Sequence, residues 1–230
     1  LGVEEYVAMG YPAEAMRNYL ARLGWAHGDD EVFTTEQALD WFDLSGIGKS
    51  PARLDFKKLD HVSGQHIARM EDDALLSAIA SWRAAAELPP LSPEDRDRLA
   101  SALPIIKGSA RKLPDLLDKA QFAMARRPIV AEPKAAKALD AVSIGILSEL
   151  TPQLQNASWD RDTLEAIAGR IAEARGLGLG KIAAPLRAAL AGKTATPSVF
   201  DMMIVLGREE TLARIDDAAS SGPRLGATEN

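Results

Sequence analysis

Short segments with helix-start signals, each ended by proline or glycine, follow one another along most of this chain. Residues 71–86 predict a helix, which the Leu-Pro-Pro sequence at 88–90 ends. Ser-Pro-Glu at 92–94 supplies an N-cap residue, a proline suited to a first helical turn and an acidic residue, and we expect that helix to stop near Pro104. Another helix is expected over 113–124. Short helices joined by proline-bearing loops predict an α-helical bundle and not a sheet.

The last third of the chain follows the same pattern. The proline at position 152 is expected to end one helix, and the glycine-rich segment 176–180 separates two others. The tail, residues 220–230, has the composition of a disordered terminus. The expected helices cover residues 134–150, 161–171, 181–191, 198–206 and 208–219.

The first 67 residues combine two helices with a loop that carries cations. Pro12 suits the first turn of a helix that has one apolar face and ends at Gly24. Thr34 and Gln37 have the spacing of a capping box, and the helix that they begin carries a second apolar stripe. The turn-rich loop GIGKSPAR follows at 46–53, and a third element comes after it.

Five segments, in this order along the chain, carry a family resemblance: NYLARLGW at 18–25, KSPAR at 49–53, KKL at 57–59, LRAALAG at 186–192 and LGREE at 206–210. The first three resemble the stem-contact region of bacterial glutamyl-tRNA synthetases, and the last two resemble the C-terminal signature of that family. The resemblance spans roughly residues 1–215. It implies a mainly α fold, with a class I synthetase stem-contact block followed by an α-helical anticodon-binding bundle in two subdomains.

The catalytic motifs of that family are absent from this sequence. Family members carry a His-Ile-Gly-His-like motif and a Lys-Met-Ser-Lys-Ser-like loop that bind ATP, and neither occurs here. No glycine-rich phosphate loop follows a strand either. We therefore interpret the chain as the C-terminal portion of a longer, ATP- and magnesium-dependent glutamate-tRNA ligase. This portion is expected to have no catalytic residue and no cofactor of its own, and to be inactive alone.

Helix-breaking prolines and glycines, together with the family resemblance, divide the chain into four parts. Residues 1–69 are expected to form the stem-contact domain, residues 70–140 and 141–219 the two anticodon-binding subdomains, and 220–230 the tail. No apolar run approaches the ~20 residues of a membrane span. The chain has no cysteine and only three histidines, so we expect neither a disulfide nor a metal site. A cytoplasmic protein without membrane or DNA partners is expected.

Charge is distributed unevenly. The formal net charge of −6 argues against a protein that binds nucleic acid over its whole surface. The window 104–137, in contrast, holds eight lysines and arginines against three acidic residues. Such a window can attract phosphates locally while the rest of the surface repels them. On charge alone, a solvated helix face explains the window better than RNA contact does.

The resemblance places residues 104–113 in the helical region that meets the anticodon. RNA sequence is read on unpaired loop bases, by stacking on aromatic or guanidinium planes and by hydrogen bonds to base edges. Gly108 and Ser109 stand where the family usually has a charged pair ending in arginine, which leaves the choice between tRNA(Glu) and tRNA(Gln) open. The candidate anticodon contacts are Lys107, Arg111, Lys112, Arg126, Arg127, Arg187 and Arg208.

Aromatic stacking platforms are scarce, because the chain has four tryptophans, three tyrosines and five phenylalanines. Trp25, Trp41 and Phe42 lie at apolar periodic positions and are expected in the core. Trp82 and Trp159 flank polar stretches, and their placement stays open. Planar contacts to bases are therefore expected mainly from arginine.

The loop at 46–53 and the residues after it supply the candidate contacts to the tRNA stem. Ser50 can cap a helix that begins at Pro51, which would leave backbone N–H groups and nearby cations facing a phosphate. A solvated loop with no RNA contact is the alternative. The candidate stem contacts are Lys49, Ser50, Arg53, Lys57 and Lys58.

These observations predict a tRNA-binding module whose partner is tRNA(Glu), with glutamate and ATP bound only by the missing catalytic domain. A second hypothesis is a helical protein-interaction module that no longer binds tRNA, which Gly108 and Ser109 favour. A third, that the chain is itself a hydrolase or transferase, has little support. Its acidic pairs, 29–30, 72–73 and 209–210, are explained as helix caps or solvated faces, and no nucleophile and base are suggested.

Overall fold

The structure, a computed structural model, describes residues 2–48 and 53–221. The chain divides into two compact units, residues 1–118 (unit 1) and 119–230 (unit 2). The regular elements of the described residues are helices, with one isolated antiparallel bridge between Trp25 and Ile47. The prediction of a mainly α fold is confirmed. The boundary between the units falls inside the predicted subdomain 70–140, and the three block boundaries stay predictions.

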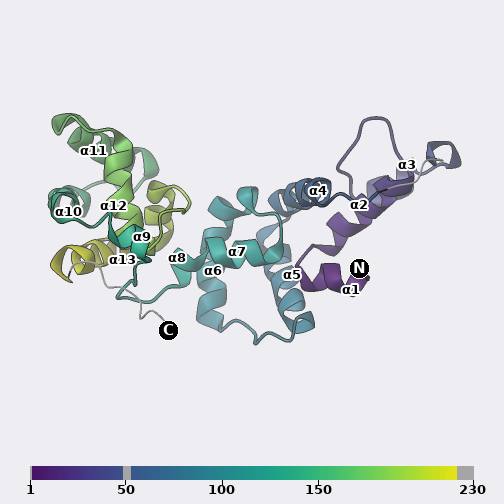
Figure 1. Cartoon of the computed structure of the whole chain (residues 1–230), viewed down its shortest axis with the longest axis horizontal. Helices are drawn as coiled ribbons and strands as arrows, with labels where there is room; N and C mark the ends of the chain where they lie inside the picture. Colours follow the sequence, from purple (N-terminus) through teal and green to yellow (C-terminus); the bar gives the residue numbers. More distant parts are fainter. Residues whose placement is uncertain (1, 49–52, 222–230) are drawn as a thin grey trace. The chain divides into compact units, whose positions relative to one another are not determined.

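Unit 1 is built around two helix pairs. α2 packs on α4, and their contact holds a core cluster that includes Tyr11, Met16, Leu59 and Val62. α5 and α6 run side by side, joined by the proline-rich loop (Figure 1). The helices that begin in this unit are α1 (Val3–Ala8), α2 (Ala13–Gly24), α3 (Thr35–Trp41), η1 (Leu44–Gly46), α4 (Phe56–Arg69), α5 (Asp72–Ala85), α6 (Pro93–Ile106), η2 (Lys107–Ser109) and α7 (Leu113–Lys119).

Unit 2 is a bundle with α12 at its centre, packed against α10, α11 and α13 (Figure 1). Apolar side chains of these helices, among them Leu147, Leu164 and Leu186, are buried between them. Burial of such side chains is the main stabilising term for the bundle. The helices are α8 (Gln121–Met124), α9 (Pro133–Ala136), α10 (Ala141–Gln155), α11 (Arg161–Ala174), α12 (Leu179–Ala191) and α13 (Val199–Ser221).

Local signals explain where several helices begin. Thr34 and Gln37 form the predicted capping box: the hydroxyl of Thr34 accepts from Gln37 N at 3.2 Å, and Thr34 N donates to Gln37 Oε1 at 2.9 Å. Ser92 caps α6 by accepting from Asp95 N at 3.1 Å. Pro12 is the N-cap residue of α2 and does not lie in its first turn. Capping chemistry was therefore readable from the sequence.

Two helix ends were predicted wrongly. α6 passes Pro104 and ends at Ile106, and α10 passes Pro152 and ends at Gln155. Leu150 and Leu154, on either side of Pro152, are both buried. Packing on both sides of the proline outweighs the loss of one backbone hydrogen bond. The side chain of Thr151 also donates to the carbonyl of Leu147, one turn back, at 3.0 Å.

Two predicted helices are each divided. The segment 134–150 is divided because Asp140 caps a new helix, its carboxylate accepting from Ser143 N at 2.8 Å. The segment 113–124 is interrupted at Ala120, between α7 and α8. The two helices predicted over 198–219 meet at Gly207, whose φ of 77° and ψ of 169° kink α13.

The predicted aromatic core is only partly correct. Trp25 is buried, whereas Phe42, the C-cap residue of α3, is 55% exposed. Trp41 is half-buried and stacks on His27 with ring centroids 4.4 Å apart. Phe42 extends past the end of its helix, where helical periodicity no longer sets the direction of the side chain. None of the described helices has the length and apolar character that crossing a bilayer requires.

Candidate nucleic-acid interface

A pocket between α2 and the start of α4 carries the best placed cations of unit 1. It is a cavity of about 640 Å³, which we call the α2–α4 pocket. Cationic, apolar and hydroxyl-bearing side chains share its wall, so it can accept a charged backbone and the ribose or base beside it. Its lining residues are Tyr19, Arg22, Leu23, Arg53, Leu54, Asp55, Phe56, Lys58 and Val62.

Hydrogen bonds to Asp55 fix the first turn of α4 beside this pocket. Its carboxylate caps the helix by accepting from Lys57 N at 2.8 Å and Lys58 N at 3.3 Å. The hydroxyl of Tyr19 accepts from Asp55 N at 2.7 Å and donates to the Asp55 carbonyl at 3.1 Å, which ties this turn to α2. The side chains of Lys57 and Lys58 are exposed. The capped first turn of α4 therefore holds both lysines at the surface beside the pocket.

The cap predicted at Ser50 is not the one that starts α4. Residues 53–55 are not helical, and α4 begins at Phe56 with Asp55 as its N-cap residue. The sequence offered several polar residues before this helix, and Asp55 is preferred because Tyr19 also holds its backbone. Lys49 and Ser50 lie outside the described residues, and their part in stem contact stays a prediction.

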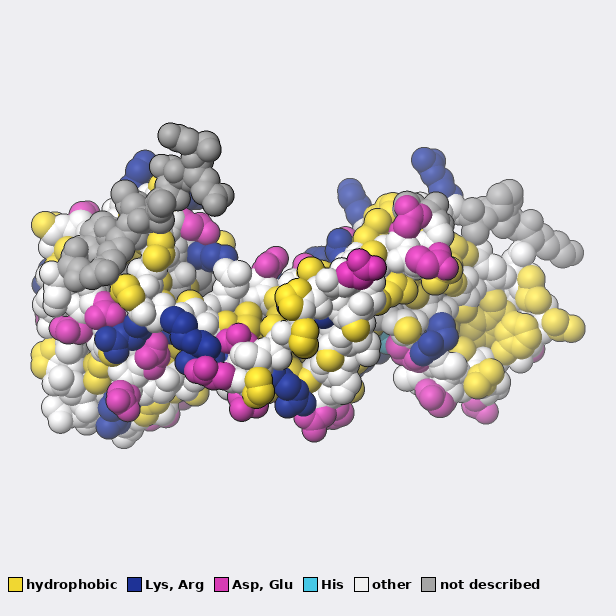
Figure 2. Space-filling view, turned by 90° about the horizontal axis from the view of Figure 1, so that it is seen from below, with side chains coloured by type: hydrophobic (Ala, Val, Ile, Leu, Met, Phe, Trp, Pro, Cys, Tyr) yellow, Lys and Arg dark blue, Asp and Glu magenta, His cyan; other side chains and the backbone are white. Residues whose placement is uncertain are grey.

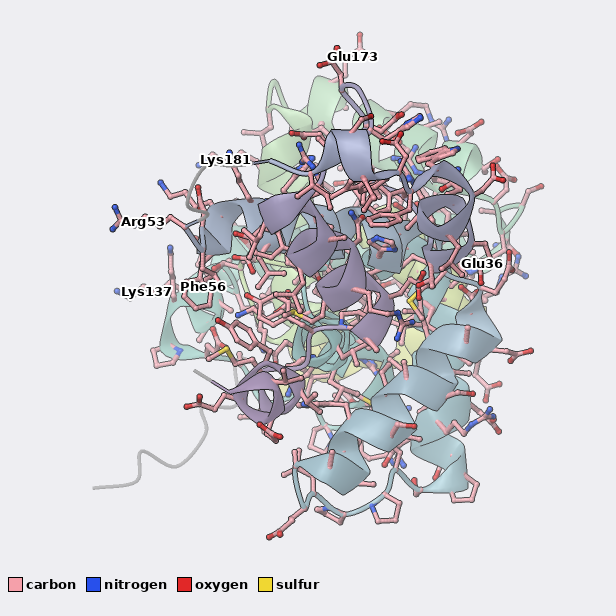
Figure 3. All side chains as sticks on the ribbon, turned by 90° about the vertical axis from the view of Figure 1, so that its right-hand side faces the viewer. Glu36, Arg53, Phe56, Lys137, Glu173 and Lys181 are labelled. Carbon is pink, nitrogen blue, oxygen red and sulfur yellow. The ribbon has the colours of Figure 1, made fainter. Side chains whose placement is uncertain are left out.

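The three cations of the α2–α4 pocket differ in their pairing. Arg22 Nη1 lies 3.1 Å from Glu31 Oε1. The charged groups of Arg53 and Lys58 form no hydrogen bond or ion pair with any side chain that the structure describes, and Arg53 extends away from the ribbon (Figure 3). An unpaired exposed cation can neutralise a phosphate without first breaking a protein contact. Arg53 and Lys58 are thus the cations most open to a nucleic-acid backbone in this pocket.

An apolar patch covers the other side of α2. Leu39, Phe42, Leu44 and Ile47 are all strongly exposed. Figure 2 shows hydrophobic surface at the α3 end of unit 1. α2 turns Arg17 and Ala21 toward an apolar pocket on this side and Tyr19 and Leu23 toward the α2–α4 pocket. Because phosphates need cations, RNA contact in this part of unit 1 is expected on the α2–α4 side.

Lys107, a predicted anticodon contact, is engaged inside unit 1. Its ammonium group donates to the Met70 carbonyl at 2.9 Å and to Asp72 Oδ1 at 2.8 Å, and its side chain is 24% exposed. These bonds join η2 to the junction between α4 and α5. A base or phosphate that binds Lys107 has to compete with this ion pair.

Arg111 and Lys112 lie at the start of α7 and keep their charge at the surface. Both backbone N–H groups donate to Asp115 Oδ2, at 2.8 and 3.0 Å. Lys112 Nζ lies 5.3 Å from the centre of the Tyr11 ring, a cation–π distance. Burial and the neighbouring Asp60 carboxylate, which accepts from the Tyr11 hydroxyl at 2.6 Å, raise the pKa of Tyr11, so its ring stays neutral. Arg111 is the more exposed cation of the two.

Gly108 lies between these cations, next to Ser109, and has no packing reason to lack a Cβ. A Cβ added to Gly108 would meet no atom within 4 Å. Ser109 donates its hydroxyl to the Ile106 carbonyl at 3.2 Å, a bond local to the 3-10 turn. A Cβ fits at position 108, so the fold does not require glycine there.

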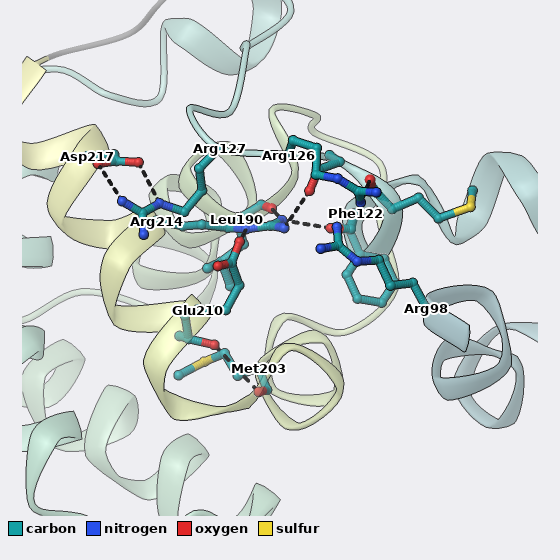
Figure 4. A network of polar contacts seen from close by, with 12 residues as sticks. Arg98, Phe122, Arg126, Arg127, Leu190, Met203, Glu210, Arg214 and Asp217 are labelled. Carbon is teal, nitrogen blue, oxygen red and sulfur yellow. Dashed lines mark hydrogen bonds and ion pairs between the residues drawn. The ribbon is translucent and has the colours of Figure 1, made fainter. Parts of the chain in front are cut away.

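In unit 2, Arg126 and Arg127 follow α8 directly and are exposed. Arg126 Nη1 donates to the Met124 carbonyl at 3.1 Å. Arg127 Nε donates to Asp217 Oδ2 of α13 at 2.9 Å, in the ion pair drawn in Figure 4. Hydrogen bonding to Asp217 raises the pKa of Arg127, which therefore stays charged. Both guanidinium groups have defined positions at one edge of the bundle.

Arg187 and Arg208 have different surroundings. Arg187 is half-buried on α12. Arg208 is exposed, but its guanidinium lies 5.3 Å from the centre of the Trp159 ring and donates to the Ala157 carbonyl. Trp159 in turn donates to the Met203 carbonyl at 3.1 Å. Arg208 thus ties the loop before α11 to α13, and both arginines stay predictions as RNA contacts.

The basic window 104–137 is divided by the boundary between the units. Lys107, Arg111 and Lys112 belong to unit 1, whereas Arg126 and Arg127 belong to unit 2. Proximity along the sequence suggested one charged surface, but the two groups rest on separate cores. They are best treated as two candidate surfaces.

Sequence reasoning missed Arg214, the largest fully buried side chain among the described residues, which is 2% exposed. Its guanidinium reaches three backbone carbonyls and the Glu210 carboxylate. The only available signal was the Glu210–Arg214 spacing of four residues, which is equally typical of an exposed helical ion pair.

The fold defines a helical class of protein with exposed cations on both units, and sequence comparison identifies its family. The sequence model of the family described as "Anticodon binding domain" matches residues 75–219, so the chain belongs to that family. The chain is 66% identical over 221 residues to Glutamate–tRNA ligase 1 of Dinoroseobacter shibae and 64% identical over 219 residues to Glutamate–tRNA ligase 2 of Paracoccus denitrificans. These matches cover 96% and 95% of the chain, but only 47% of each relative.

A solved structure agrees with these matches. The glutamate tRNA ligase of Elizabethkingia meningosepticum, solved in complex with its amino acid, aligns with a TM-score of 0.73 at 28% identity. The alignment covers 93% of this chain and 42% of that protein. The recognised resemblance to the C-terminal part of glutamyl-tRNA synthetases is confirmed, and the comparisons do not favour the protein-interaction alternative.

Proposed function

We propose that this chain binds tRNA(Glu) as the tRNA-recognising part of a glutamate-tRNA ligase. The observation that carries the proposal is the anticodon-binding family match over 75–219, together with exposed arginines on that same segment. Splayed loop bases would stack on guanidinium planes and pair through their edges with arginine and lysine donors. The chain would thereby hold the anticodon end of the tRNA.

The α2–α4 pocket would supply a second point of attachment, through Arg53 and Lys58. Phosphate contacts fix register and orientation and carry no sequence information themselves. Two separated contacts on one rigid RNA fix its direction as well as its position. In the relatives, about half of whose length this chain spans, such orientation would direct the 3′ end toward the remaining part.

The chemistry belongs to the same proposal but not to these residues. Glutamate, ATP and magnesium would be bound by other parts of a whole ligase, which would activate glutamate and esterify it to the terminal adenosine. The contribution of this chain would be binding energy, spent on placing the acceptor end correctly. A cytoplasmic location would follow from that role.

A titration tests the proposal directly. Full tRNA(Glu), its anticodon stem-loop and a stem-loop with scrambled loop bases are titrated against the chain at two salt concentrations. We expect tighter binding of the cognate loop and an affinity that falls as salt rises, because phosphate contacts release counterions. Equal affinity for both loops with no salt dependence would reject the proposal and favour the protein-interaction module.

A further inference from the structure

The backbone around α8 is held by one buried guanidinium. Arg214 of α13 donates from Nη1 to the carbonyls of Phe122 and Leu190, each at 2.6 Å, and from Nη2 to the carbonyl of Ala125 at 2.9 Å (Figure 4). Ala125 is the C-cap residue of α8, and Leu190 lies in the last turn of α12. Carbonyls at helix C-termini lack intrahelical partners, and a cation is favourable there.

The residues that directly follow the backbone held by Arg214 are two of the predicted anticodon contacts. Arg126 and Arg127 come directly after Ala125, so the carbonyl that Arg214 holds belongs to the residue before them. One turn further along α13, Asp217 holds the Arg127 side chain at 2.9 Å. The same helix thus fixes both the backbone at Ala125 and the guanidinium of Arg127.

We propose that Arg214 is a positioning residue for tRNA recognition, setting the place and direction of Arg126 and Arg127 without touching RNA itself. This inference rests on the proposed function. Preorganised side chains lose less conformational entropy on binding, and hence bind more tightly than the same side chains on a mobile segment. A buried arginine suits this task because its planar fork reaches several carbonyls at once.

The first variant is Arg214→Lys, which keeps the charge but replaces the fork by a single ammonium group that cannot span the three carbonyls. Hydrogen exchange should become faster at the amides of residues 122–127. Affinity for the cognate anticodon stem-loop should fall about tenfold, under conditions where both proteins are shown to be folded. Arg161→Lys is the matched control, since Arg161 also pairs with α13, at Asp201, and should leave both readouts unchanged.

Arg214→Lys is then repeated in the Arg126→Ala/Arg127→Ala background. If Arg214 acts through these arginines, the second substitution should cost almost nothing there. An equal loss in both backgrounds would show a general structural role and overturn the inference. Unchanged exchange at 122–127 would overturn it as well.

Glu210→Ala provides a second route if Arg214→Lys does not fold. Glu210 Oε1 accepts from Arg214 Nε at 2.7 Å, but its own side chain is 36% exposed, so its removal disturbs the core packing less than a change at Arg214 does. The same dependence on Arg126 and Arg127 is expected, with a smaller loss of affinity. An equal loss without the two arginines would overturn the inference.

If Arg126→Ala/Arg127→Ala alone does not weaken binding, the inference fails while the proposed function stands. Wild-type protein that binds no tRNA would reject both.

Discussion

The two units present their cations in different ways. In unit 1, Arg53 and Lys58 border a pocket, and their charged groups pair with none of the described side chains. In unit 2, Arg127 is paired with Asp217, and Arg208 is stacked on Trp159. Unpaired cations on flexible side chains suit a phosphate backbone, which tolerates small displacements. Paired and stacked guanidinium groups are fixed in direction, as the reading of base edges requires.

This difference assigns affinity for RNA mainly to unit 1 and selectivity among RNA loops mainly to unit 2. A protein with a net charge of −6 cannot rely on a general field to retain RNA. The α2–α4 pocket supplies local attraction, and the internal partners of the unit 2 arginines hold the guanidinium groups in fixed directions. A loop whose bases do not match those directions gains little from them, which favours discrimination over strength.

The largest expected effect concerns unit 2. Replacing Arg126 and Arg127 together by Ala should weaken binding of the anticodon stem-loop by about 2 kcal/mol, because each stacked base contributes ~1 to 3 kcal/mol. The slope of log affinity against log salt should flatten by up to about two. Titrations of the stem-loop at several salt concentrations measure both quantities. An unchanged slope would remove these arginines from the interface.

The next effect tests unit 1. Arg53→Ala with Lys58→Ala should weaken full tRNA about tenfold and leave the isolated anticodon stem-loop unaffected, since backbone contacts add affinity without reading sequence. Lys134→Ala with Lys137→Ala, two exposed cations outside the proposed contacts, serves as the charge-matched control. Similar losses on both RNAs would contradict the division of labour between the units.

A gain-of-function variant tests whether the residues at 108 and 109, where the family usually has a charged pair, meet the RNA. Ser109→Arg restores the cation that the family usually carries and sacrifices only the local bond to Ile106. One added guanidinium contact should strengthen binding of the cognate stem-loop severalfold, about 1 kcal/mol. Ser109→Gln, of similar length but neutral, is the control. Equal binding by wild type and the arginine variant would mean that this turn does not meet the RNA.

Sequence reasoning captured what is local. The capping box at Thr34 and Gln37 and the cap at Ser92 depend on spacing alone, and both were predicted correctly. The course of α10 past Pro152 and the exposure of Phe42 depend on packing between distant segments, which spacing does not contain. The same limit explains the site: exposed arginines could be named, but Arg214 could not be recognised as buried.

The partners of the cations, like the packing of Pro152 and Phe42, depend on segments that are distant in the sequence. Lys107 was selected because of its place in a basic window, yet Asp72, 35 residues earlier, engages it. Arg127 was predicted as an anticodon contact, yet Asp217, 90 residues later, holds it. Charge density along the sequence identifies cations, whereas their availability depends on partners brought by the fold.

The smallest expected effect contrasts the stability of the units. All three histidines lie in unit 1, and His66 is buried, its Nε2 lying 2.8 Å from Asn18 Oδ1. Burial lowers the pKa of His66 below 6.5, with Glu14 opposing the shift and Arg69 adding to it. Between the lowered pKa and 6.5 the unfolded chain binds more protons than the folded one, so stability falls as pH decreases through that range.

Unit 1 should therefore lose a fraction of 1 kcal/mol on acidification from pH 7 to 5.5, whereas unit 2, without histidine, should change less. Hydrogen exchange, followed separately for amides in α4 and α12, measures the two responses in one sample. His66→Gln keeps a donor toward Asn18 but does not titrate in this range, and it should remove the difference. A pH response of α4 that persists in this variant would assign it to groups other than His66.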